Sequence, residues 1–501
     1  MLWTIFLLLS GLLTLLLLYS TRTRQNNEPP LDKGVLPWLG HALEFSKDAA
    51  KFLGRMKDRH GDIFTVRVAG IYLTVLLDPN SFDAVMNDTV FLDFTRIRNK
   101  LLQRVFGLQL PCIKPQAERK WMEQHFQGVS LSKLSSSMSA HLHSLLLRNQ
   151  KEFNPSEWRQ DGLFSLCYSL LFRAGYLTMF ERRDDASAVY EEFRKFDDLL
   201  AKLARGSLKR GESKTADSCR GRLWELLSPK RLSGGSGSNS WQQSYRGFLQ
   251  DEGVDGEMQK RALLLQLWTT QCNAGPAAFW LLGFLLTHPE AMEAVKSEIR
   301  GLRDTNQQHP AAITLLEAHS TPVLDSALSE TLRLTAAVMI NREVVQDKTL
   351  LMAGGRRYHL RKGDRVCLFP FLSPQMDPQI HQEPQIFKYD RFLNPDSTVK
   401  DEFYKDGKKL KYSTMPWGAG SSICVGKQFA VTAIKQFVFL LLTNLDLEMC
   451  DPEAKLPPVN PSRYGFGMLQ PDGDLQVSFR LKRTPRAMKL RADVKTQRRK
   501  S

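Results

Sequence analysis

The sequence lacks the paired cysteines of a disulfide scaffold or a zinc finger. No Cys-x-x-Cys pair occurs, and the number of cysteines, seven, is odd. Scattered thiols of this kind argue against a disulfide framework and indicate a reducing compartment for most of the chain. A lone cysteine therefore remains as a candidate ligand or nucleophile, among Cys112, Cys167, Cys219, Cys272, Cys367, Cys424 and Cys450.

The sequence also has no internal repeats and no motif typical of nucleic-acid binding, so we expect neither a solenoid nor a nucleic-acid partner. Its net charge of +16 is concentrated at one end. From Arg480 to Ser501 there are ten Lys or Arg and one acid, a net +9, so the rest of the chain carries +7. The basic tail, residues 484–501, is either a disordered, solvated end or a segment attracted to an anionic membrane face.

Charge is missing from the first twenty residues. Eighteen uncharged residues, Leu2 to Tyr19, precede Arg22 and Arg24, a length at the lower limit for a bilayer span. A cleaved signal peptide is the alternative, but no positive charge precedes the apolar run and no small-x-small cleavage site follows it. We expect a transmembrane signal-anchor over residues 1–20, single-pass in the endoplasmic reticulum membrane. The positive charges follow the span, which predicts a cytosolic catalytic domain.

Helical patterns dominate the chain after a basic, proline-rich linker at residues 21–37. Residues 38–483 are expected to form one domain. Two short strands are predicted at 63–68 and 71–77, further strands between 342 and 372, and a hairpin that turns at Asp472-Gly473-Asp474. Residues 233–240, SGGSGSNS, indicate a surface loop. The expected fold class is mainly α with small β-sheets.

The strongest local signal is PWGAGSSICVGKQFA, from Pro416 to Ala430. Gly418 and Gly420 permit a tight turn in which the backbone approaches another group closely. Cys424 then lies where a helix begins, and the positive end of the helix dipole favours its thiolate. A buried structural cysteine is the alternative interpretation.

The spacing Trp417-x-x-Gly420-x-x-x-Cys424-x-Gly426 resembles the haem-binding loop of the cytochrome P-450 superfamily, Phe-x-x-Gly-x-x-x-Cys-x-Gly. Trp replaces Phe here, and Ser422 occupies a position that is commonly basic. The resemblance implies the cytochrome P-450 fold, preceded in this chain by one N-terminal transmembrane helix. It also implies a haem b cofactor, with Cys424 as the axial thiolate ligand of the iron.

A second signature of that family is Glu330-x-x-Arg333, in which two charges three residues apart share a helix face. Glu191-x-x-Arg194 has the same spacing, so only the context selects the first pair. Downstream, Pro384-x-x-Phe387-x-x-x-Arg391-Phe392 resembles the family's third element. The resemblance implies that Glu330, Arg333 and Arg391 form a buried charge network that braces the haem loop.

Further positions resemble those at which the family contacts the haem propionates. Arg342, in INREVV, matches a frequent propionate-binding arginine. Trp121 and His125 lie four apart on a predicted helix, where the family often has Trp and Arg. A histidine can donate a hydrogen bond to a propionate, but a surface histidine is the alternative.

The long helix predicted from about residue 257 to 286 contains QCNAGP, residues 271–276. A proline inside a helix costs roughly 3 kcal/mol or more, because it removes one N–H donor and clashes with the preceding turn. Oxygen-activating members of the family usually carry an acid–threonine pair here, which relays protons to dioxygen. This segment has no carboxylate, and Asn273 can donate or accept a hydrogen bond but does not deliver a proton. The pattern favours rearrangement of a substrate that already contains an O–O bond.

Stretches outside the haem motifs, such as LAKLARGSLKRG and GRLWELLSPKRL, resemble the branch of the superfamily that isomerises prostaglandin endoperoxide (prostaglandin H2) to prostacyclin. That resemblance implies a lipid endoperoxide substrate and no need for dioxygen or a reductase. We also expect a membrane-bound monomer. A sister branch, the sterol 12-alpha-hydroxylases, shares the Asn-x-Gly-Pro helix yet uses dioxygen and an NADPH-fed reductase, so both activities stay open. A non-catalytic haem- or lipid-binding protein is the third possibility.

The isomerase hypothesis assigns roles to particular residues. Cys424 and Asn273 are the predicted catalytic residues, and Asn273 is expected to orient the substrate. The apolar wall of the site is predicted from Trp268, Phe466 and Met468, for which ordinary core packing is the alternative.

Overall fold

The computed structural model describes residues 2–19, 22–110, 113–151, 157–180, 185–228, 240–305 and 321–482. The predicted surface loop, apart from Ser240, and the basic tail lie outside the described residues.

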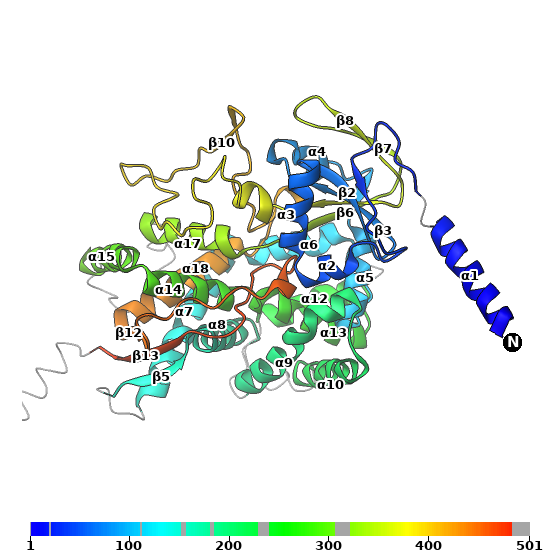
Figure 1. The fold of residues 1–501 in the computed structure, drawn as a ribbon. Coiled ribbons are helices and arrows are strands. Elements are labelled where there is room, and N and C mark those ends of the chain that lie inside the picture. Colours follow the sequence, from blue (N-terminus) through cyan, green and yellow to red (C-terminus); the bar gives the residue numbers. More distant parts are fainter. Residues whose placement is uncertain are drawn as a thin grey trace, which may run out of the picture.

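Helices make up most of the described chain, as expected from the sequence (Figure 1). The N-terminal half contains α1 (Leu2–Tyr19), α2 (Ala42–Lys47), α3 (Ala49–His60), α4 (Asp83–Met86), α5 (Thr95–Phe106), α6 (Pro115–His125), α7 (Gly128–Lys151), α8 (Leu163–Phe180), α9 (Ala186–Arg205) and α10 (Arg210–Leu226). The C-terminal half contains α12 (Trp241–Asp251), α13 (Gly256–Gln271), α14 (Ala274–Thr287), α15 (Pro289–Thr305), α17 (Pro322–Thr335) and α18 (Lys427–Asn444).

The largest sheet has six strands in the order β1-β2-β3-β9-β6-β4 and lies on the side of the body nearest to α1 (Figure 1). Its strands are β1 (Leu31–Asp32), β2 (Ile63–Val68), β3 (Ile71–Leu76), β4 (Leu92–Asp93), β6 (Ile340–Val344) and β9 (Arg365–Leu368). The β2–β3 pair is antiparallel, whereas β3 and β9 are parallel although nearly 300 residues separate them in sequence. The predicted strands at 63–68 and 71–77 are confirmed to within one residue.

Three smaller sheets complete the fold. They pair β7 (Lys348–Leu351) with β8 (Arg357–Leu360), β10 (Tyr404–Lys405) with β11 (Lys408–Lys409), and β12 (Leu445–Met449) with β13 (Gln476–Leu481) and β5 (Arg159–Gly162). The predicted hairpin at 472–474 is wrong, because β13 pairs antiparallel with β12 and β5 and not with the residues just before the turn. Backbone groups of Gly465, Gly467 and Leu469 bond instead to Thr335 and Ala337, at the end of α17 and just after it.

The core lies where α8, α14, α17 and α18 pack on one another. Nearly every residue of α14 is apolar, and ten of its fourteen residues are buried; a helix that is apolar on all sides is expected to be surrounded by other elements. By contrast, α9 is amphipathic and buries Val189, Phe193, Phe196 and Leu200, which recur at helical spacing along one face. Helix α14 therefore lies in the hydrophobic centre, whereas α9 packs against the outside of that centre with one face.

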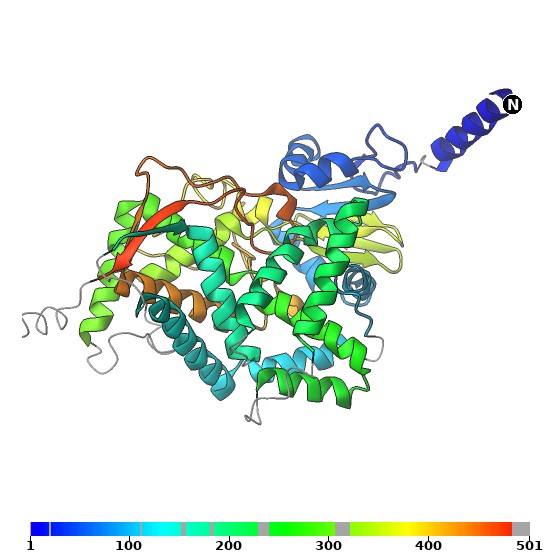
Figure 2. The same ribbon diagram turned by 90° about the horizontal axis from the view of Figure 1, so that it is seen from below.

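The N-terminal helix α1 stands away from the body in both views (Figures 1 and 2). Its side chains that can be described are largely exposed, for example Trp3 at 76% and Leu8 at 73%. Among the described residues, α8 is the one helix that is long and apolar enough to cross a bilayer, but most of it is buried inside the body. The apolar stretch of α1, Trp3–Leu15, is shorter, so the predicted span stays a prediction.

The segment predicted to be a linker is attached to the sheet. Leu31 and Asp32 pair with β2, and Arg22 forms an ion pair with Asp364 with an N–O distance of 2.7 Å. Arg361 pairs with the buried Glu28. The described residues from 22 onward are therefore held against the body by paired charges.

Candidate functional site

Cys424 lies in a loop between the short turn Gly420–Ser422 and α18, as the sequence predicts. The Cys424 N–H donates to the carbonyl of Trp417 at 2.8 Å, which closes the loop. Gly418 has φ +69°, and a Cβ there would lie 2.7 Å from the Ser422 carbonyl oxygen. Only glycine combines that conformation with so close an approach. The loop presents the Cys424 side chain in an exposed position.

The electrostatic expectation for Cys424 needs correction. The Gly426 N–H and the charges of Arg119 and Lys427 lower the pKa of the thiol, as a helix start should. Desolvation by the surrounding atoms is the larger effect, and the pKa is raised overall. The helix start by itself therefore does not favour the thiolate, and a bound metal ion would ionise the coordinating thiol outright.

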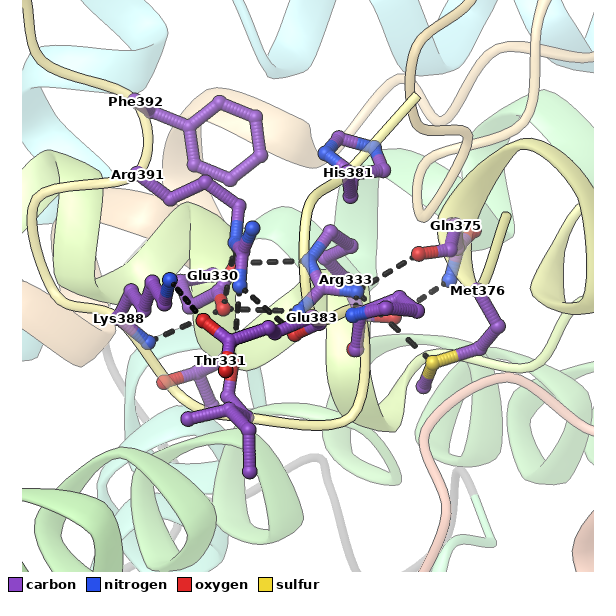
Figure 3. Close-up of polar contacts among 12 residues, drawn as sticks. Glu330, Thr331, Arg333, Gln375, Met376, His381, Glu383, Lys388, Arg391 and Phe392 are labelled. Atoms are coloured by element: carbon purple, nitrogen blue, oxygen red, sulfur yellow. Dashed lines mark hydrogen bonds and ion pairs between the residues drawn. The ribbon is translucent and has the colours of Figure 1, made fainter. Parts of the chain in front are cut away.

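The predicted charge network is confirmed (Figure 3). Glu330 and Arg333 are fully buried in α17, and Arg333 donates to both Glu330 oxygens at 2.7 and 2.8 Å. Arg391 Nε contacts the same two oxygens at 2.9 Å. One carboxylate thus pairs with two guanidinium groups, and its loss would leave both of them without an ion-pair partner in a buried environment.

Gln375 connects this network to the Cys424 loop. Arg333 donates to the Gln375 carbonyl at 2.7 Å, while the Gln375 side-chain amide donates to the carbonyls of Arg333 and Ala336 at 2.8 Å. Its side-chain oxygen accepts from the Met415 N–H at 3.4 Å, immediately before the loop. Sequence reasoning missed Gln375, because a single glutamine outside any motif carries no recognisable signal.

Arg342 provides a test of whether the site fits haem. It is 7% exposed, and its guanidinium donates to the hydroxyl of Ser422 at 2.9 Å and to its neighbour's carbonyl. Among the described residues, no carboxylate lies within ion-pair distance of it, and burial lowers the pKa of Arg342. A buried, unpaired cation beside the Cys424 loop suits an anionic group such as a haem propionate. The residues present therefore fit the cofactor.

Trp121 and His125 lie together on α6, with stacked rings 3.9 Å apart. Both ring nitrogens of His125 already have partners, since Nδ1 contacts the Trp121 carbonyl and Nε2 the Ser244 hydroxyl, both at 2.9 Å. A propionate would have to displace one of them, so a haem contact by His125 stays a prediction. Arg119, on the same helix, donates to the Ile423 carbonyl at 3.0 Å; sequence reasoning missed it.

The long central helix is broken as predicted, into α13 and α14, with Cys272 and Asn273 between them. Pro276 has no N–H, so the Cys272 carbonyl loses the donor that an uninterrupted helix would supply. The buried Tyr168 hydroxyl, from α8, donates to that carbonyl at 3.3 Å. Burial, followed by the Asp197 charge, raises the pKa of the Cys272 thiol. The Tyr168 hydroxyl therefore replaces, at the helix break, the hydrogen bond that Pro276 cannot make.

Asn273 is clamped to the loop that precedes β13. Its Oδ1 accepts from the Met468 N–H at 3.0 Å. Gly467, at φ +91°, makes this approach possible, because a Cβ there would lie 2.6 Å from Asn273 Oδ1. A backbone N–H can only donate, so the amide oxygen must face Met468 and the amide NH2 must face away from it. No hydrogen-bond acceptor for that NH2 occurs among the described residues.

A second buried carboxylate, Asp197 on α9, holds this loop in place. Arg463 donates to both Asp197 oxygens at 3.1 and 2.9 Å, and Gln470 donates at 2.7 Å. Arg194 adds a contact at 3.1 Å, and Tyr168 lies 3.5 Å away. Desolvation is the largest single effect and raises the pKa of Asp197, but the charges of Arg463 and Arg194, together with hydrogen bonds from Arg463 and Gln470, lower this pKa overall. Residues 463–470 are thus fixed at both ends by one acid.

The predicted apolar wall is partly assembled around this loop. Trp268 on α13 packs on Phe106 with ring centroids 5.8 Å apart, and its indole N–H is buried without a partner among the described residues. Phe466 is half-buried, and Met468 is buried in the core. Whether these side chains contact a substrate stays a prediction.

Comparison with known proteins gives the same assignment as the Cys424 and Glu330 motifs. The family profile described as Cytochrome P450 matches residues 273–477. The chain is similar to prostacyclin synthase of Homo sapiens, with 49% identity over 92% of this chain and 95% of that protein. It is 50% identical to prostacyclin synthase of Bos taurus over the same shares. It is also similar to 7-alpha-hydroxycholest-4-en-3-one 12-alpha-hydroxylase of Homo sapiens, at 41% identity over 92% of this chain and 94% of that protein. The chain therefore belongs to the cytochrome P450 family and is a haem-thiolate protein.

Proposed function

We propose that this protein is an isomerase that converts prostaglandin endoperoxide to prostacyclin without dioxygen or a reductase. One observation carries the proposal: identity to prostacyclin synthases is 49–50% over nine-tenths of the chain, against 41% to sterol 12-alpha-hydroxylases. The composition of the helix break supports it, because residues 271–276 contain no carboxylate to relay protons.

The reaction is a rearrangement, so substrate and product contain the same atoms and no electrons are supplied from outside. The O–O bond breaks, a C–O bond forms between one of its oxygens and a side-chain double bond, and a proton moves from carbon to the other oxygen. Bound haem supplies a Lewis-acidic ferric iron with an electron-rich thiolate behind it, which assists O–O cleavage. In this proposal Cys424 would be the ligand, and Arg342, Trp121 and His125 would hold the propionates.

Asn273 is assigned the distal role because of its fixed orientation. The Met468 N–H holds the amide oxygen, which leaves the NH2 group as a donor directed away from the loop. Such a donor can orient an endoperoxide oxygen and stabilise negative charge on it as the bond breaks. Trp268, Phe466 and Met468 would supply the apolar surface around the carbon chains.

The membrane assignment belongs to the same proposal. The exposed apolar side chains of α1 suit a lipid-facing helix, and the arginines that follow suit a cytosolic catalytic domain in the endoplasmic reticulum membrane. A membrane-held monomer would receive its lipid substrate from the bilayer. The segment boundaries at 20, 37 and 483 are proposed with it.

The second candidate function is a monooxygenase of the sterol 12-alpha-hydroxylase type. The 41% identity to those enzymes favours it over other P450 activities. A substrate hydroxyl or an ordered water would then replace the missing acid and threonine, and an NADPH-fed reductase would be a partner.

Purified holoprotein, incubated with prostaglandin H2 in the absence of NADPH and reductase, separates the two. We expect formation of prostacyclin, detected as its stable hydrolysis product. Turnover only with NADPH and reductase, and of a sterol, would establish the alternative. No turnover under either condition, with intact haem spectra, would leave a non-catalytic lipid- or haem-binding protein.

Two variants at one position test the role of Asn273. Asn273→Asp keeps an oxygen for the Met468 N–H but removes the NH2 donor, whereas Asn273→Ala removes both. We expect kcat to fall by about a hundredfold to a thousandfold in Asn273→Asp, the effect of losing one donor to a developing charge. Unchanged turnover in both variants would make Asn273 a packing residue.

A further inference from the structure

The last residue of α9, Arg205, is an arginine with an unusual set of partners. Its guanidinium donates to two backbone carbonyls, that of Ser46 in α2 at 3.3 Å and that of Ser462 in the turn Pro461–Arg463 at 2.9 Å. Both acceptors are neutral. They use two of the five N–H groups of a guanidinium, so further donors remain for another ligand.

The charge of Arg205 is not compensated within the described part of the chain. No carboxylate there lies within ion-pair distance of it, and desolvation lowers its pKa with no acid acting in the opposite direction. Its neighbours differ: Arg194 and Arg463 both pair with Asp197. The comparable residue is Arg342, which is buried, has no ion-pair partner within the described residues although the Asp93 charge acts on it, and fits an anionic propionate. A partly desolvated cation of this kind is costly unless an anion joins it.

Arg205 lies beside the predicted substrate wall. Its guanidinium carbon is 5.5 Å from the centroid of the Phe466 ring. Phe466 is two residues before Met468, whose N–H holds Asn273. Arg205 and Asn273 therefore contact the same short loop, two residues apart, at Phe466 and at Met468.

We propose that Arg205 binds the carboxylate of an acidic lipid whose oxygenated part lies at Asn273. The inference rests on the proposed function and sharpens it, since the substrate must then be a fatty-acid derivative with a free carboxyl group. A neutral sterol gains nothing from such a cation. A charge-assisted pair between guanidinium and carboxylate fixes one end of a flexible chain and thereby orients the other end.

The test uses full-length holoprotein in neutral detergent, which contains no competing anionic headgroup. The probe is a stable prostaglandin H2 analogue in which a carbon atom replaces one peroxide oxygen, as the free acid and as its methyl ester. Binding is followed by the shift of the haem Soret band. We expect the wild type to prefer the acid, and Arg205→Gln to raise the Kd of the acid by about tenfold or more while leaving that of the ester unchanged.

Two further variants separate charge from structure. Arg205→Lys keeps the charge but not the double carbonyl contact, so it should retain part of the preference for the acid. Arg104→Gln is the matched control. Arg104 donates to the carbonyl of Ala204, the residue before Arg205, at 3.5 Å. In the described structure it has no contact with Phe466. It should bind both probes as the wild type does.

The outcomes are distinct. Equal affinity of the wild type for acid and ester, or an equal loss of both in Arg205→Gln, overturns the role of Arg205 and leaves the isomerase proposal intact. A wild type that gives no Soret shift with either probe overturns the isomerase proposal itself. A shift with neutral sterols alone points to the hydroxylase.

Discussion

Two buried carboxylates, Glu330 and Asp197, support different parts of the candidate site, and each pairs with two arginines. Glu330 pairs with Arg333 and Arg391 and supports the Cys424 loop through Gln375. Asp197 pairs with Arg194 and Arg463 and holds the loop that clamps Asn273. The first fixes the residue that would bind iron; the second fixes the residue that would meet substrate. The same arrangement, one buried carboxylate paired with two arginines, thus supports two parts of the site that have different roles.

The two clusters differ in how their partners are distributed along the chain. Arg333 is three residues from Glu330 on the same helix, which is a spacing that can be recognised in a sequence. Arg463, the more buried of the two arginines that pair with Asp197, is 266 residues away. The pair Glu191-x-x-Arg194 has the same spacing as the first motif, yet Arg194 pairs with Asp197 and Asp198 instead. A local spacing therefore indicates that two charged side chains can form an ion pair. Their burial in the fold decides which pairs form.

The largest effect is expected from a change that touches neither cluster. Cys424→Ser preserves the size of the side chain and both charge networks but removes the thiolate. We expect complete loss of turnover and of the long-wavelength Soret band that thiolate-ligated ferrous haem shows with carbon monoxide. Retention of that band would mean that another residue binds the iron.

Neutralising each carboxylate tests the proposed division of labour. Glu330→Gln leaves two buried guanidinium groups uncompensated, which costs about 3–5 kcal/mol of folding free energy. We expect poor haem retention and a changed carbon monoxide spectrum. Asp197→Asn should cost a comparable free energy but leave that spectrum normal in the folded fraction, while weakening binding of the endoperoxide analogue. If both variants alter the same property, the two clusters do not have separate functions.

The loss of folding stability at acid pH should come from the part of the structure around the Cys424 loop and the Glu330 network. Burial, together with the charges of Arg333 and Arg391, lowers the pKa of His381 to about 3 from its ordinary 6.5, against smaller opposing effects of the Ser413 carbonyl and Asp377. Between these values the unfolded chain binds a proton that the folded chain does not, so stability falls as the pH falls below about 6.5. The loss by pH 5 is about 2 kcal/mol.

His381→Gln measures this contribution, because it keeps a donor for the Ser413 carbonyl but has no titrating group. Its thermal midpoint should decline less between pH 7.5 and 5 than that of the wild type. Parallel declines would show that other groups are responsible.

The smallest effect is expected at the helix break. Tyr168→Phe removes the hydroxyl that satisfies the Cys272 carbonyl and should cost about 1 kcal/mol in stability. The control is Tyr190→Phe, whose ring lies 6.1 Å from that of Tyr168. Because Tyr168 acts on the backbone beside Asn273, its loss should also lower kcat, and it should do so less in an Asn273→Ala background. A loss of stability without a change in kcat would limit Tyr168 to a structural role.

Much of the structure around Cys424 could be predicted from the sequence. The turn glycines, the cysteine, the start of α18 and the Glu330–Arg333 pair are all defined by residues within a few positions of one another, and local spacing specifies such features. The strands at 63–68 and 71–76 alternate and turn locally, and they too were found. The hairpin at 472–474 was wrong because β13 pairs with strands from elsewhere, and pairing partners are not encoded in a strand's own pattern.

The sequence by itself determined the chemistry available: one thiol at a helix start, an amide in place of an acid, and a proline that must break a helix. It did not determine what compensates for that break. Only the tertiary structure brings the Tyr168 hydroxyl to the freed carbonyl and the Met468 N–H to Asn273. Within the described residues, it alone leaves Arg205 beside Phe466 with no acid as a partner. The physical reason is that a donor, an acceptor or a charge acquires its energy from its surroundings, and those surroundings come from helices and loops far apart in the chain.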